Sequence, residues 1–569
     1  MAGQESRWIV DRSQASSANG MVAAKTPQAA RAGAEVLRSG GNAVDAAVVT
    51  ALVSTVAEPW MNGLGGGGYL VRHDNRSGET SVVAFPMVSP QAAAEDMFAL
   101  TGAGADAALF GWPSVVDSAN IVGHRAVSVP GEVAGLSLAL ETWGTRSWAS
   151  AFDPAIALAE EGLPVTWHTT MEIARDLGDL NKFPATAENL CPGGIVPWSA
   201  TSDNPAMLHQ RDLAITMKTL AAEGPRSFYE GRLAGMIIGH LNDGGARFST
   251  EDFASYQARI EEPLVVNYNG HSIATMSNGS GGATLAQSIR LLDRAGVSSM
   301  AQNSVEALHT MAQAFAIAFA DRFAYLADPD FVDVPFEALL SDEYIEARQS
   351  CILPGRVAPV RAGKRIDLGV THNLATSIPD YTSGGSTTHL SVIDKEGVAV
   401  SLTQTLLSLW GSRVTIPGTG IIMNNGMMWF DPEPGRPNSI AGGKKGLSNM
   451  APAILIRDGA AVAVLGASGG RKIMNCVAQI AMNFADHGMS MQDAVSNPRI
   501  DCSTPQLLVS SRLPASTVEG LRSLGYDLSV KDEGLFFGEF SSPACAAFAD
   551  GAFQGGVDPY YYPATAAGA

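Results

Sequence analysis

Two threonines that could do chemistry, Thr387 and Thr405, lie near the two ends of the segment STTHLSVIDKEGVAVSLTQT. Apolar residues alternate with polar residues on both sides of the turn sequence Asp394–Gly397, which predicts an antiparallel β-hairpin. With the turn centred at its midpoint, the numbers of paired residues sum to about 791, so Thr387 faces Gln404 and lies within one residue of Thr405. The pattern therefore predicts that the two threonines are neighbours in space.

A threonine hydroxyl is a weak nucleophile unless a base takes its proton, and the sequence positions no histidine and carboxylate pair for that purpose. An N-terminal threonine carries its own base, because an α-amine has a pKa of about 7.7–8.0. This chemistry requires that the chain be cut between Ser386 and Thr387. The alternative is that Thr387 and Thr388 are only β-branched residues of a strand.

A glycine turn within VAVLGASGGRKIMNCVAQIAMNFADHG is the second candidate feature. The segment predicts a strand, a turn and a helix from Arg471 to His487, so the amides of Gly469 and Gly470 could stabilise an oxyanion. A plain strand-to-helix connection is the alternative. GASGG also matches the GxSxG motif with Ser468 as nucleophile. That class of hydrolase is disfavoured, because the only later histidine, His487, lies at the far end of the same helix, roughly 25 Å away.

The composition limits the possible partners. The chain has 569 residues, 46% of them hydrophobic and 16% charged, which predicts a globular protein of one large or two closely packed domains. A net charge of −19 argues against a nucleic-acid partner, which would need a basic surface. The cysteines and histidines are scattered, and no metal or dinucleotide motif is set in the right context, so we expect no cofactor. No signal-peptide pattern and no membrane-spanning apolar run occur, which predicts a soluble cytoplasmic protein without a membrane partner.

Helices dominate the first two thirds of the predicted organisation. Thr26 and Pro27 predict the capped start of one helix, and Asn42 the start of a second through AVDAAVVTALVSTVA. Strands are predicted in YLVRHD and SVVAFPMVSP, and after about residue 384 short β-branched segments alternate with turns. This grouping predicts an α+β sandwich of sheets between helical layers. Further predicted helices span residues 131–146, 151–162, 210–223, 230–241, 283–295 and 304–326.

Motifs along the chain together resemble the gamma-glutamyltranspeptidase family of N-terminal-nucleophile hydrolases. The resemblance runs from about residue 20 to about residue 560, and the motifs occur in the family's order. It implies the family's fold, a four-layer αββα sandwich. The motifs are GGNAVDAAVVTALVSTVAEPWMNGLGGGGYL, VPGEVAGL, DRFAYLADPDFVDVP, STTHLSVIDKEGVAVSLTQT, PGTGIIMNN, LSNMAP, GASGGRKI and GGVDP.

The resemblance implies that Thr387 is the nucleophile and becomes a chain end by autocatalytic cleavage after Ser386. The products would be a helix-rich fragment of residues 1–386 and a fragment of residues 387–569, which would stay associated, with a higher oligomer left open. Thr405 would orient Thr387, in agreement with the predicted hairpin.

Three further positions match the family's binding and catalytic residues, and a fourth differs. Gly469 and Gly470 match its oxyanion-hole pair, and Ser448 matches the first of two serines that contact substrate. Asn449 occupies the position of the second serine.

Four other positions depart from the family's pattern. Members that bind a glutamyl group have an arginine where this chain has Pro86, and an asparagine where it has Leu407. Polar residues that bind the α-amino group are replaced by Gly426 and Trp429. Leaving the ammonium and carboxylate of a glutamyl group unpaired would cost on the order of several kcal/mol. The departures therefore imply a more apolar, non-glutamyl acyl group, unless other residues rebuild the glutamyl contacts.

Three functions remain open at this point. The first is an amide hydrolase that forms an acyl-enzyme on Thr387 and releases a fairly apolar acyl group to water or to an acceptor amine. The second is a true γ-glutamyl hydrolase or transpeptidase. The third is a non-catalytic relative that binds a ligand and does not cleave itself. For the two enzymes, the expected partner is a small-molecule amide.

Overall fold

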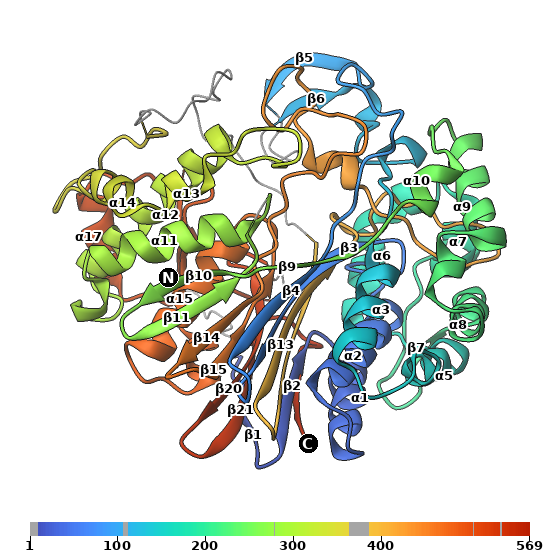
Figure 1. Cartoon of the computed structure of the whole chain (residues 1–569), viewed down its shortest axis with the longest axis horizontal. Coiled ribbons are helices and arrows are strands. Elements are labelled where there is room, and N and C mark those ends of the chain that lie inside the picture. Colours follow the sequence, from blue (N-terminus) through green and yellow to red (C-terminus); the bar gives the residue numbers. More distant parts are fainter. Residues whose placement is uncertain (1–9, 106–111, 278, 364–385, 505, 535–537) are drawn as a thin grey trace, which may run out of the picture.

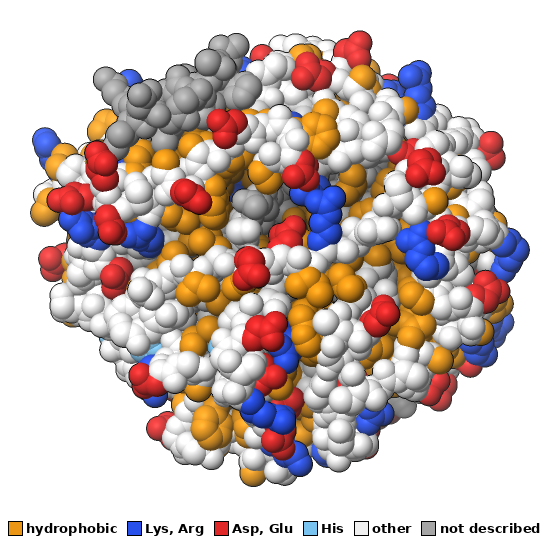
Figure 2. All heavy atoms as spheres, viewed as in Figure 1, with side chains coloured by type: hydrophobic (Ala, Val, Ile, Leu, Met, Phe, Trp, Pro, Cys, Tyr) orange, Lys and Arg blue, Asp and Glu red, His pale blue; other side chains and the backbone are white. Residues whose placement is uncertain are grey.

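The computed structural model describes residues 10–105, 112–277, 279–363, 386–504, 506–534 and 538–569. Two β-sheets lie face to face, and helices cover the outer face of each sheet (Figure 1). The result is a four-layer αββα sandwich, which confirms the predicted α+β class. On the face shown in Figure 2, acidic and basic side chains are interspersed, and hydrophobic side chains gather around a hollow near its centre.

The first sheet, sheet A, has the strand order β1-β21-β20-β15-β14-β11-β10, with the short strand β16 paired to β20. Helices α11, α12 and α15 share one apolar core with its strands. The strands of sheet A are β1 (Ala15–Ser17), β10 (Leu264–Tyr268), β11 (His271–Thr275), β14 (Ala453–Arg457), β15 (Ala460–Leu465), β16 (Ala467–Ser468), β20 (Ser542–Ala549) and β21 (Ala552–Val557).

The second sheet, sheet B, has the strand order β22-β2-β12-β13-β3-β4-β9. The predicted hairpin forms its centre as β12 and β13, and strands from the start of the chain lie on both sides of it. Strands from before Ser386 and strands from after it therefore alternate within sheet B. The strands of sheet B are β2 (Gly20–Ala24), β3 (Gly67–Asp74), β4 (Glu79–Phe85), β9 (Arg259–Glu261), β12 (Thr388–Asp394), β13 (Val398–Thr405) and β22 (Thr565–Gly568).

The helical layer outside sheet B is built around α2, in which every residue is buried. A capping box between Asn42 and Asp45 fixes the start of α2, as the predicted cap at Asn42 required. The helices on this side are α1 (Pro27–Arg38), α2 (Ala43–Ala57), α3 (Glu132–Trp143), α4 (Trp148–Ala151), α5 (Asp153–Glu161), α6 (Trp167–Leu180), α7 (Pro184–Leu190), α8 (Arg211–Glu223), α9 (Gly231–Asp243) and α10 (Thr250–Ala254).

The opposite helical layer covers sheet A (Figure 1). Its longest member, α12, is buried over most of its length. Among the helices of the described ranges, none is both long enough and apolar enough to cross a membrane. The helices of this layer are α11 (Gly281–Arg294), α12 (Val305–Tyr325), α13 (Phe336–Leu339), α14 (Asp342–Gln349), α15 (Lys472–Ala485), α16 (Met491–Ser496) and α17 (Ala515–Ser523).

Small two- and three-stranded sheets lie outside the sandwich. They pair β5 with β6, β7 with β8, and β17 with β18 and β19. Their strands are β5 (Leu100–Ala105), β6 (Pro113–Val115), β7 (Leu163–Pro164), β8 (Met207–Leu208), β17 (Ile500–Asp501), β18 (Leu507–Ser510) and β19 (Leu528–Lys531).

The predicted helices are confirmed, with ends displaced by one to three residues. Helices such as α6 and α14 were not predicted. Thr166 and Thr169 form a capping box at the start of α6, and this pair is visible in the sequence. The polar residues of these helices leave only a narrow apolar stripe, which a sequence pattern does not distinguish from a loop.

The predicted register of the hairpin is wrong by one residue. Thr388, not Thr387, pairs with Gln404, so paired numbers sum to 792. The loop that connects β12 and β13 has an odd number of residues. Gly397 adopts a left-handed φ of 84°, which suits a three-residue hairpin loop. The same register, continued by one pair, places Thr387 directly opposite Thr405.

Hydrogen bonds between side chains of sheet B and backbone groups of sheet A join the two sheets. Ser391 Oγ lies 2.8 Å from the Ala544 carbonyl oxygen, and Ser401 Oγ donates to the Leu465 carbonyl at 2.8 Å. These contacts lie beside Gly466, where a Cβ atom would meet the ring of His389 at 2.1 Å. The sheets therefore approach closely here, and only glycine fits at position 466.

The hydrogen bonds of Ser391 give a testable consequence for stability. We expect Ser391→Ala to lower the free energy of unfolding by about 1–3 kcal/mol, because buried carbonyl groups lose their donor. Urea unfolding measures this change. The exposed Ser299 is the control, and Ser299→Ala should change stability by less than about 0.5 kcal/mol. Equal stability of the two variants would contradict a structural role of the contacts between the sheets.

Candidate active site

The hydroxyl of Thr387 contacts the peptide bond that precedes it in the chain. Thr387 Oγ1 donates a short hydrogen bond to the Ser386 carbonyl oxygen and lies 3.2 Å from Thr405 Oγ1. Thr405 Oγ1 also lies 3.2 Å from the Ser386 carbonyl oxygen and accepts the Leu407 N–H at 2.8 Å. The predicted proximity of the two threonines is confirmed. Both hydroxyls also contact the carbonyl group of the Ser386–Thr387 peptide bond, which the sequence predicts to be cut.

The residues around this bond are buried and held from both sides. Ser386 Oγ lies 3.1 Å from the Trp60 carbonyl oxygen, and Thr388 Oγ1 donates to Glu58 Oε2 at 2.5 Å. Thr387 is 4% exposed. Because bulk water is excluded, the hydrogen bonds at Thr387 are electrostatically stronger than they would be at the surface.

His389, two residues after Thr387, serves the structure of the sheet. Its Nδ1 lies 2.8 Å from Thr403 Oγ1, and its Nε2 lies 3.0 Å from Ser391 Oγ. Burial lowers the pKa of His389 to about 3, so the ring is neutral at physiological pH. Both ring nitrogens are occupied by hydroxyl groups, and the ring bridges β12 and β13 and does not meet the Thr387 hydroxyl.

Gly469 and Gly470 lie between β16 and α15, as predicted, and both are buried. Both have positive φ angles, 137° and 63°. A Cβ at Gly469 would lie 2.7 Å from Ser541 Oγ, so the loop requires glycine there. Among the described residues, no hydrogen-bond acceptor is found for the N–H of either glycine. Unpaired buried amides at this loop are suited to receive negative charge.

Ser448 and Asn449 are positioned by the buried Arg322 of α12. Arg322 donates to the Ser448 carbonyl oxygen at 2.7 Å and to Asn449 Oδ1 at 2.9 Å. It also donates to the Ser280 carbonyl at 2.9 Å, which joins this segment to the start of α11. Arg322 was not among the sequence-predicted site residues. The adjacent charged residues Asp321 and Arg322, in an otherwise apolar part of the helix, were the signal that could have indicated it.

The positions that depart from the family's pattern lie in or next to buried apolar structure. Leu407 and Trp429 belong to the same apolar core cluster, together with Met428. Pro86 directly follows β4, which lies two strands from β13 in sheet B, about 10 Å by the usual strand spacing. Gly426 begins the short 3₁₀ helix η7, Gly426–Trp429.

Hydrogen bonds hold the segment that precedes η7 beside the residues after Thr405. Asn425 donates its N–H to the Leu406 carbonyl at 3.1 Å, and its Oδ1 accepts the Ser408 N–H at 3.1 Å. At Gly426, a Cβ would lie 2.6 Å from Ser128 Oγ, so a side chain there would require the backbone to move.

Leu407 adopts a left-handed backbone conformation, with φ 92°. This region is unfavourable for leucine and tolerated by glycine and asparagine. Trp410 and Arg413, shortly after it, also have positive φ, at 60° and 64°. The backbone thus keeps a conformation that suits asparagine, while the side chain at position 407 is apolar.

Two arginines line a small cavity next to the predicted substrate positions. Arg322 and Arg471 border it together with Trp429 and Asn449. The guanidinium carbon of Arg471 lies 4.4 Å from the centre of the Phe323 ring. Arg471 directly follows the two glycines, so this cavity adjoins the loop that carries their amides. Among the described residues, no hydrogen bond directly joins the Thr387 and Thr405 hydroxyls to Ser448, Asn449 or the glycine amides.

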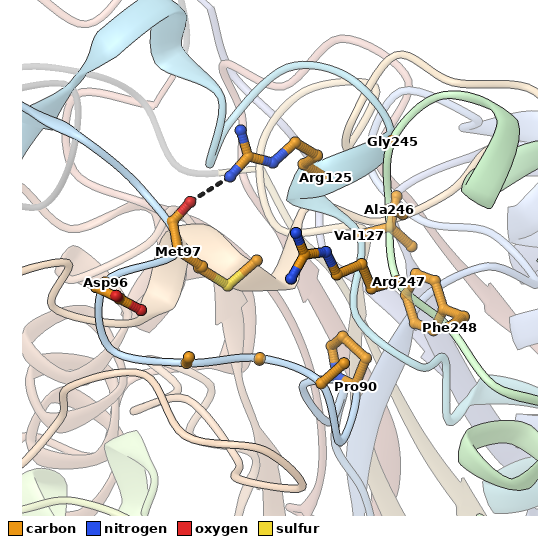
Figure 3. A pocket seen from close by; sticks show the side chains of 12 residues that line it. Pro90, Asp96, Met97, Arg125, Val127, Gly245, Ala246, Arg247 and Phe248 are labelled. Atoms are coloured by element: carbon orange, nitrogen blue, oxygen red, sulfur yellow. Dashed lines mark hydrogen bonds between the residues drawn. The ribbon is translucent and has the colours of Figure 1, made fainter.

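A larger cavity, of about 490 Å³, lies apart from the predicted site residues. It is bordered by residues 90–97, 125–127 and 245–248. In Figure 3, the side chains of Arg125 and Arg247 lie on the same side of it, and Arg125 donates to the Met97 carbonyl. None of the sequence-predicted site residues lines this cavity.

Comparison with known proteins shows which family the chain resembles. A model described as gamma-glutamyltranspeptidase matches residues 29–560. The Acylase ACY 1 proenzyme of Pseudomonas sp. (strain SE83) is 35% identical over 521 residues, covering 91% of this chain and 88% of that protein. The Glutathione hydrolase proenzyme of Bacillus subtilis (strain 168) is 34% identical over 486 residues, covering 85% of this chain and 80% of that protein.

Solved structures share the fold. The cephalosporin acylase from Bacillus halodurans aligns with a TM-score of 0.85 and 24% identity, covering 100% of this chain and 99% of that chain. A chain of the Helicobacter pylori gamma-glutamyltranspeptidase aligns with a TM-score of 0.54 and 30% identity, covering 59% of this chain and 93% of that chain.

The contacts of Thr405 lead to a prediction about stability. We expect Thr405→Val to lower the free energy of unfolding by about 1–3 kcal/mol relative to Thr405→Ser, because the buried Leu407 N–H loses its acceptor. Both variants are made on a Thr387→Ala background, so that single chains are compared by urea unfolding. A valine variant no less stable than the serine variant would contradict the prediction, because the hydroxyl would then contribute no more than the methyl group.

Proposed function

This chain belongs to the gamma-glutamyltranspeptidase family, and we propose that it is an amide hydrolase that cuts its own Ser386–Thr387 bond and then uses Thr387 as an N-terminal nucleophile. The observation that carries the proposal is the position of the Thr387 hydroxyl, which lies against the Ser386 carbonyl and 3.2 Å from Thr405 Oγ1. A hydroxyl placed in this way can attack its own preceding peptide bond.

Maturation begins with an N-to-O acyl shift. Thr387 Oγ1 attacks the Ser386 carbonyl carbon, the C–N bond breaks, and an ester joins the two residues. Water then hydrolyses the ester, which leaves a carboxylate on Ser386 and a free α-amine on Thr387. Thr405 assists, because its hydroxyl lies 3.2 Å from the same carbonyl oxygen and can donate a hydrogen bond to it.

In the mature enzyme, Thr387 Oγ1 attacks the substrate amide while its α-amine accepts the proton. With a pKa of about 7.7–8.0, roughly 10–20% of the α-amine is neutral and can act as a base at pH 7, and this fraction rises with pH. The amides of Gly469 and Gly470 receive the negative charge on the former carbonyl oxygen. The amine product leaves, and water or an acceptor amine releases the acyl group.

The two fragments would remain together after the cut. Sheet B alternates strands from residues 1–386 with strands from residues 387–569, and sheet A does the same. Separating the fragments would expose both sheets and the core between them. The mature protein is therefore expected to be an associated pair of fragments.

The acyl group is proposed to be less polar than a γ-glutamyl group. Leu407, Met428 and Trp429 form part of an apolar core cluster where glutamyl-binding relatives have polar contacts. An ammonium group placed there would lose its hydration without gaining a partner. Relatives named acylase and glutathione hydrolase are similar to this chain at 35% and 34% identity, so overall similarity does not favour either acyl group.

A second candidate substrate carries a carboxylate, as a γ-glutamyl group does. The observation in its favour is the cavity shared by Arg322, Arg471 and Asn449 beside Trp429. Guanidinium groups bind carboxylates well. Arg322 already donates to three backbone carbonyls, and burial lowers its pKa to about 9. Arg471 borders the same cavity and is the residue proposed for such a contact.

The first experiment tests the nucleophile. We expect the wild-type chain to appear on denaturing electrophoresis and mass spectrometry as fragments of 386 and 183 residues (569 − 386), and Thr387→Ala to remain one inactive chain. Thr387→Ser keeps a hydroxyl and should still be cut. A Thr387→Ala chain that is cut after residue 386 would disprove the maturation route. An intact, inactive wild-type chain would favour the non-catalytic alternative.

The second experiment separates the acyl groups with anilides of three acids. A butyryl group has no charge, a glutaryl group has only a distal carboxylate, and a γ-glutamyl group has both carboxylate and ammonium. We expect the γ-glutamyl anilide to have the lowest kcat/KM, by roughly tenfold or more, because its ammonium has no partner. Leu407→Asn should reduce this difference, since asparagine restores polarity at a left-handed position. A γ-glutamyl anilide that is the best substrate would support the glutamyl hydrolase instead.

A further inference from the structure

Lys25 crosses from sheet B to sheet A in the buried core. It follows β2 directly and is 1% exposed. Its Nζ donates to Ser468 Oγ at 2.9 Å and forms a short hydrogen bond with Ser542 Oγ. Ser468 and Ser542 are paired across β16 and β20. The ammonium therefore ties the end of β2 to the residue that precedes Gly469.

The same ammonium is linked to the neighbour of Thr387 through two side chains. Lys25 Nζ lies 3.6 Å from the centre of the Tyr561 ring, a cation–π distance. The Tyr561 hydroxyl donates to Glu58 Oε1, and Glu58 Oε2 accepts the Thr388 hydroxyl at 2.5 Å. Lys25 and Glu58 are thus connected through Tyr561.

Trp60 extends this network to the other side of Thr387. Its indole Nε1 donates to the Tyr561 hydroxyl at 3.1 Å, and its carbonyl oxygen lies 3.1 Å from Ser386 Oγ. The network therefore contacts the residue before Thr387, the residue after it, and Ser468, which precedes the Gly469–Gly470 loop. No other described lysine is hydrogen-bonded to Ser468 or Ser542.

We propose that the charged form of Lys25 is a positioning residue for the reaction, because it holds the Ser468 segment so that the amides of Gly469 and Gly470 face the carbonyl under attack. The inference rests on the proposed function, since it assigns a use to the glycine amides. The adjacent Ser468 is the serine of the GASGG motif, and the structure gives its hydroxyl this role as an acceptor for Lys25.

The protonation state of Lys25 links this role to pH. Burial lowers the pKa of Lys25 to about 8, and the charge of Glu58 opposes that shift. Burial also raises the pKa of Glu58. Lys25 is charged below about pH 8 and loses its proton above it. The groups that surround it are Glu58, Asp558, Cys476, Arg12 and Tyr561, with His168 and His389, whose pKa values burial lowers to about 3.

The expected pH profile of kcat has two limbs with different origins. The acid limb follows the Thr387 α-amine, which must be neutral to act as a base. The alkaline limb follows Lys25, which must keep its proton to hold Ser468. A change at Lys25 or its partners should therefore move only the alkaline limb.

The test compares kcat, KM and pH profiles of the mature enzyme with an anilide that the wild type hydrolyses. We expect Lys25→Met to lower kcat by about tenfold or more at neutral pH, to change KM by less than about twofold, and to abolish the alkaline limb. Lys25→Arg keeps the charge and should shift the alkaline limb to higher pH. Lys218→Met removes an exposed lysine and serves as the control.

Two milder variants keep the test decisive if Lys25→Met does not fold. Ser468→Ala removes an acceptor of the Lys25 ammonium, and Glu58→Gln removes the opposing charge. Each should lower the pKa of Lys25 and shift the alkaline limb to lower pH. If the wild type is cleaved and active, and these variants keep its kcat and its alkaline limb, the role of Lys25 is overturned. The proposed function is then not affected. A wild type that neither cleaves itself nor hydrolyses any anilide would overturn both proposals.

Discussion

The hydrogen bonds between the two sheets are the constraint on which the site depends. Thr387 directly precedes β12 of sheet B and the Gly469–Gly470 loop directly follows β16 of sheet A, so their relative position depends on how the two sheets are held together. Ser391 and Ser401 bind carbonyls at the point where the ladder between β15 and β20 is interrupted. Because hydrogen bonds require short distances and defined directions, they fix how the sheets slide and rotate against each other more tightly than apolar packing does. Lys25 adds a charged contact at the same end of the sandwich.

The interleaved sheets explain how a chain could be cut at its centre and keep its structure. The hairpin of β12 and β13 lies between strands from the first part of the chain, with hydrogen bonds on both sides. A cut before Thr387 would free one chain end without removing any pair of this ladder. The new α-amine would appear at the position where the hydroxyl is already held by Thr405.

In the segment after Thr405, the backbone conformation and the side chains have different preferences. The backbone suits asparagine, whereas the side chain at position 407 is apolar. Left-handed φ angles at Leu407, Trp410 and Arg413 are costly and persist only where the surrounding structure enforces them, which is common at functional sites. The backbone here has left-handed conformations, while the side chains of Leu407 and Trp429 are part of the apolar core. The proposed acyl group would require such a combination of an unusual backbone and apolar side chains.

The sequence alone determined the α+β class, most of the long helices, the central hairpin and the neighbourhood of Thr387 and Thr405, because these depend on local periodicity and short-range pairing. It missed the register by one residue, since the loop geometry at Gly397 depends on a backbone angle that residue types only suggest. It did not indicate Arg322, Lys25 or Glu58 as parts of the site. Their partners Ser448, Ser468 and Thr388 lie more than a hundred residues away in the chain, and only the packing of the two sheets and helical layers brings these groups together.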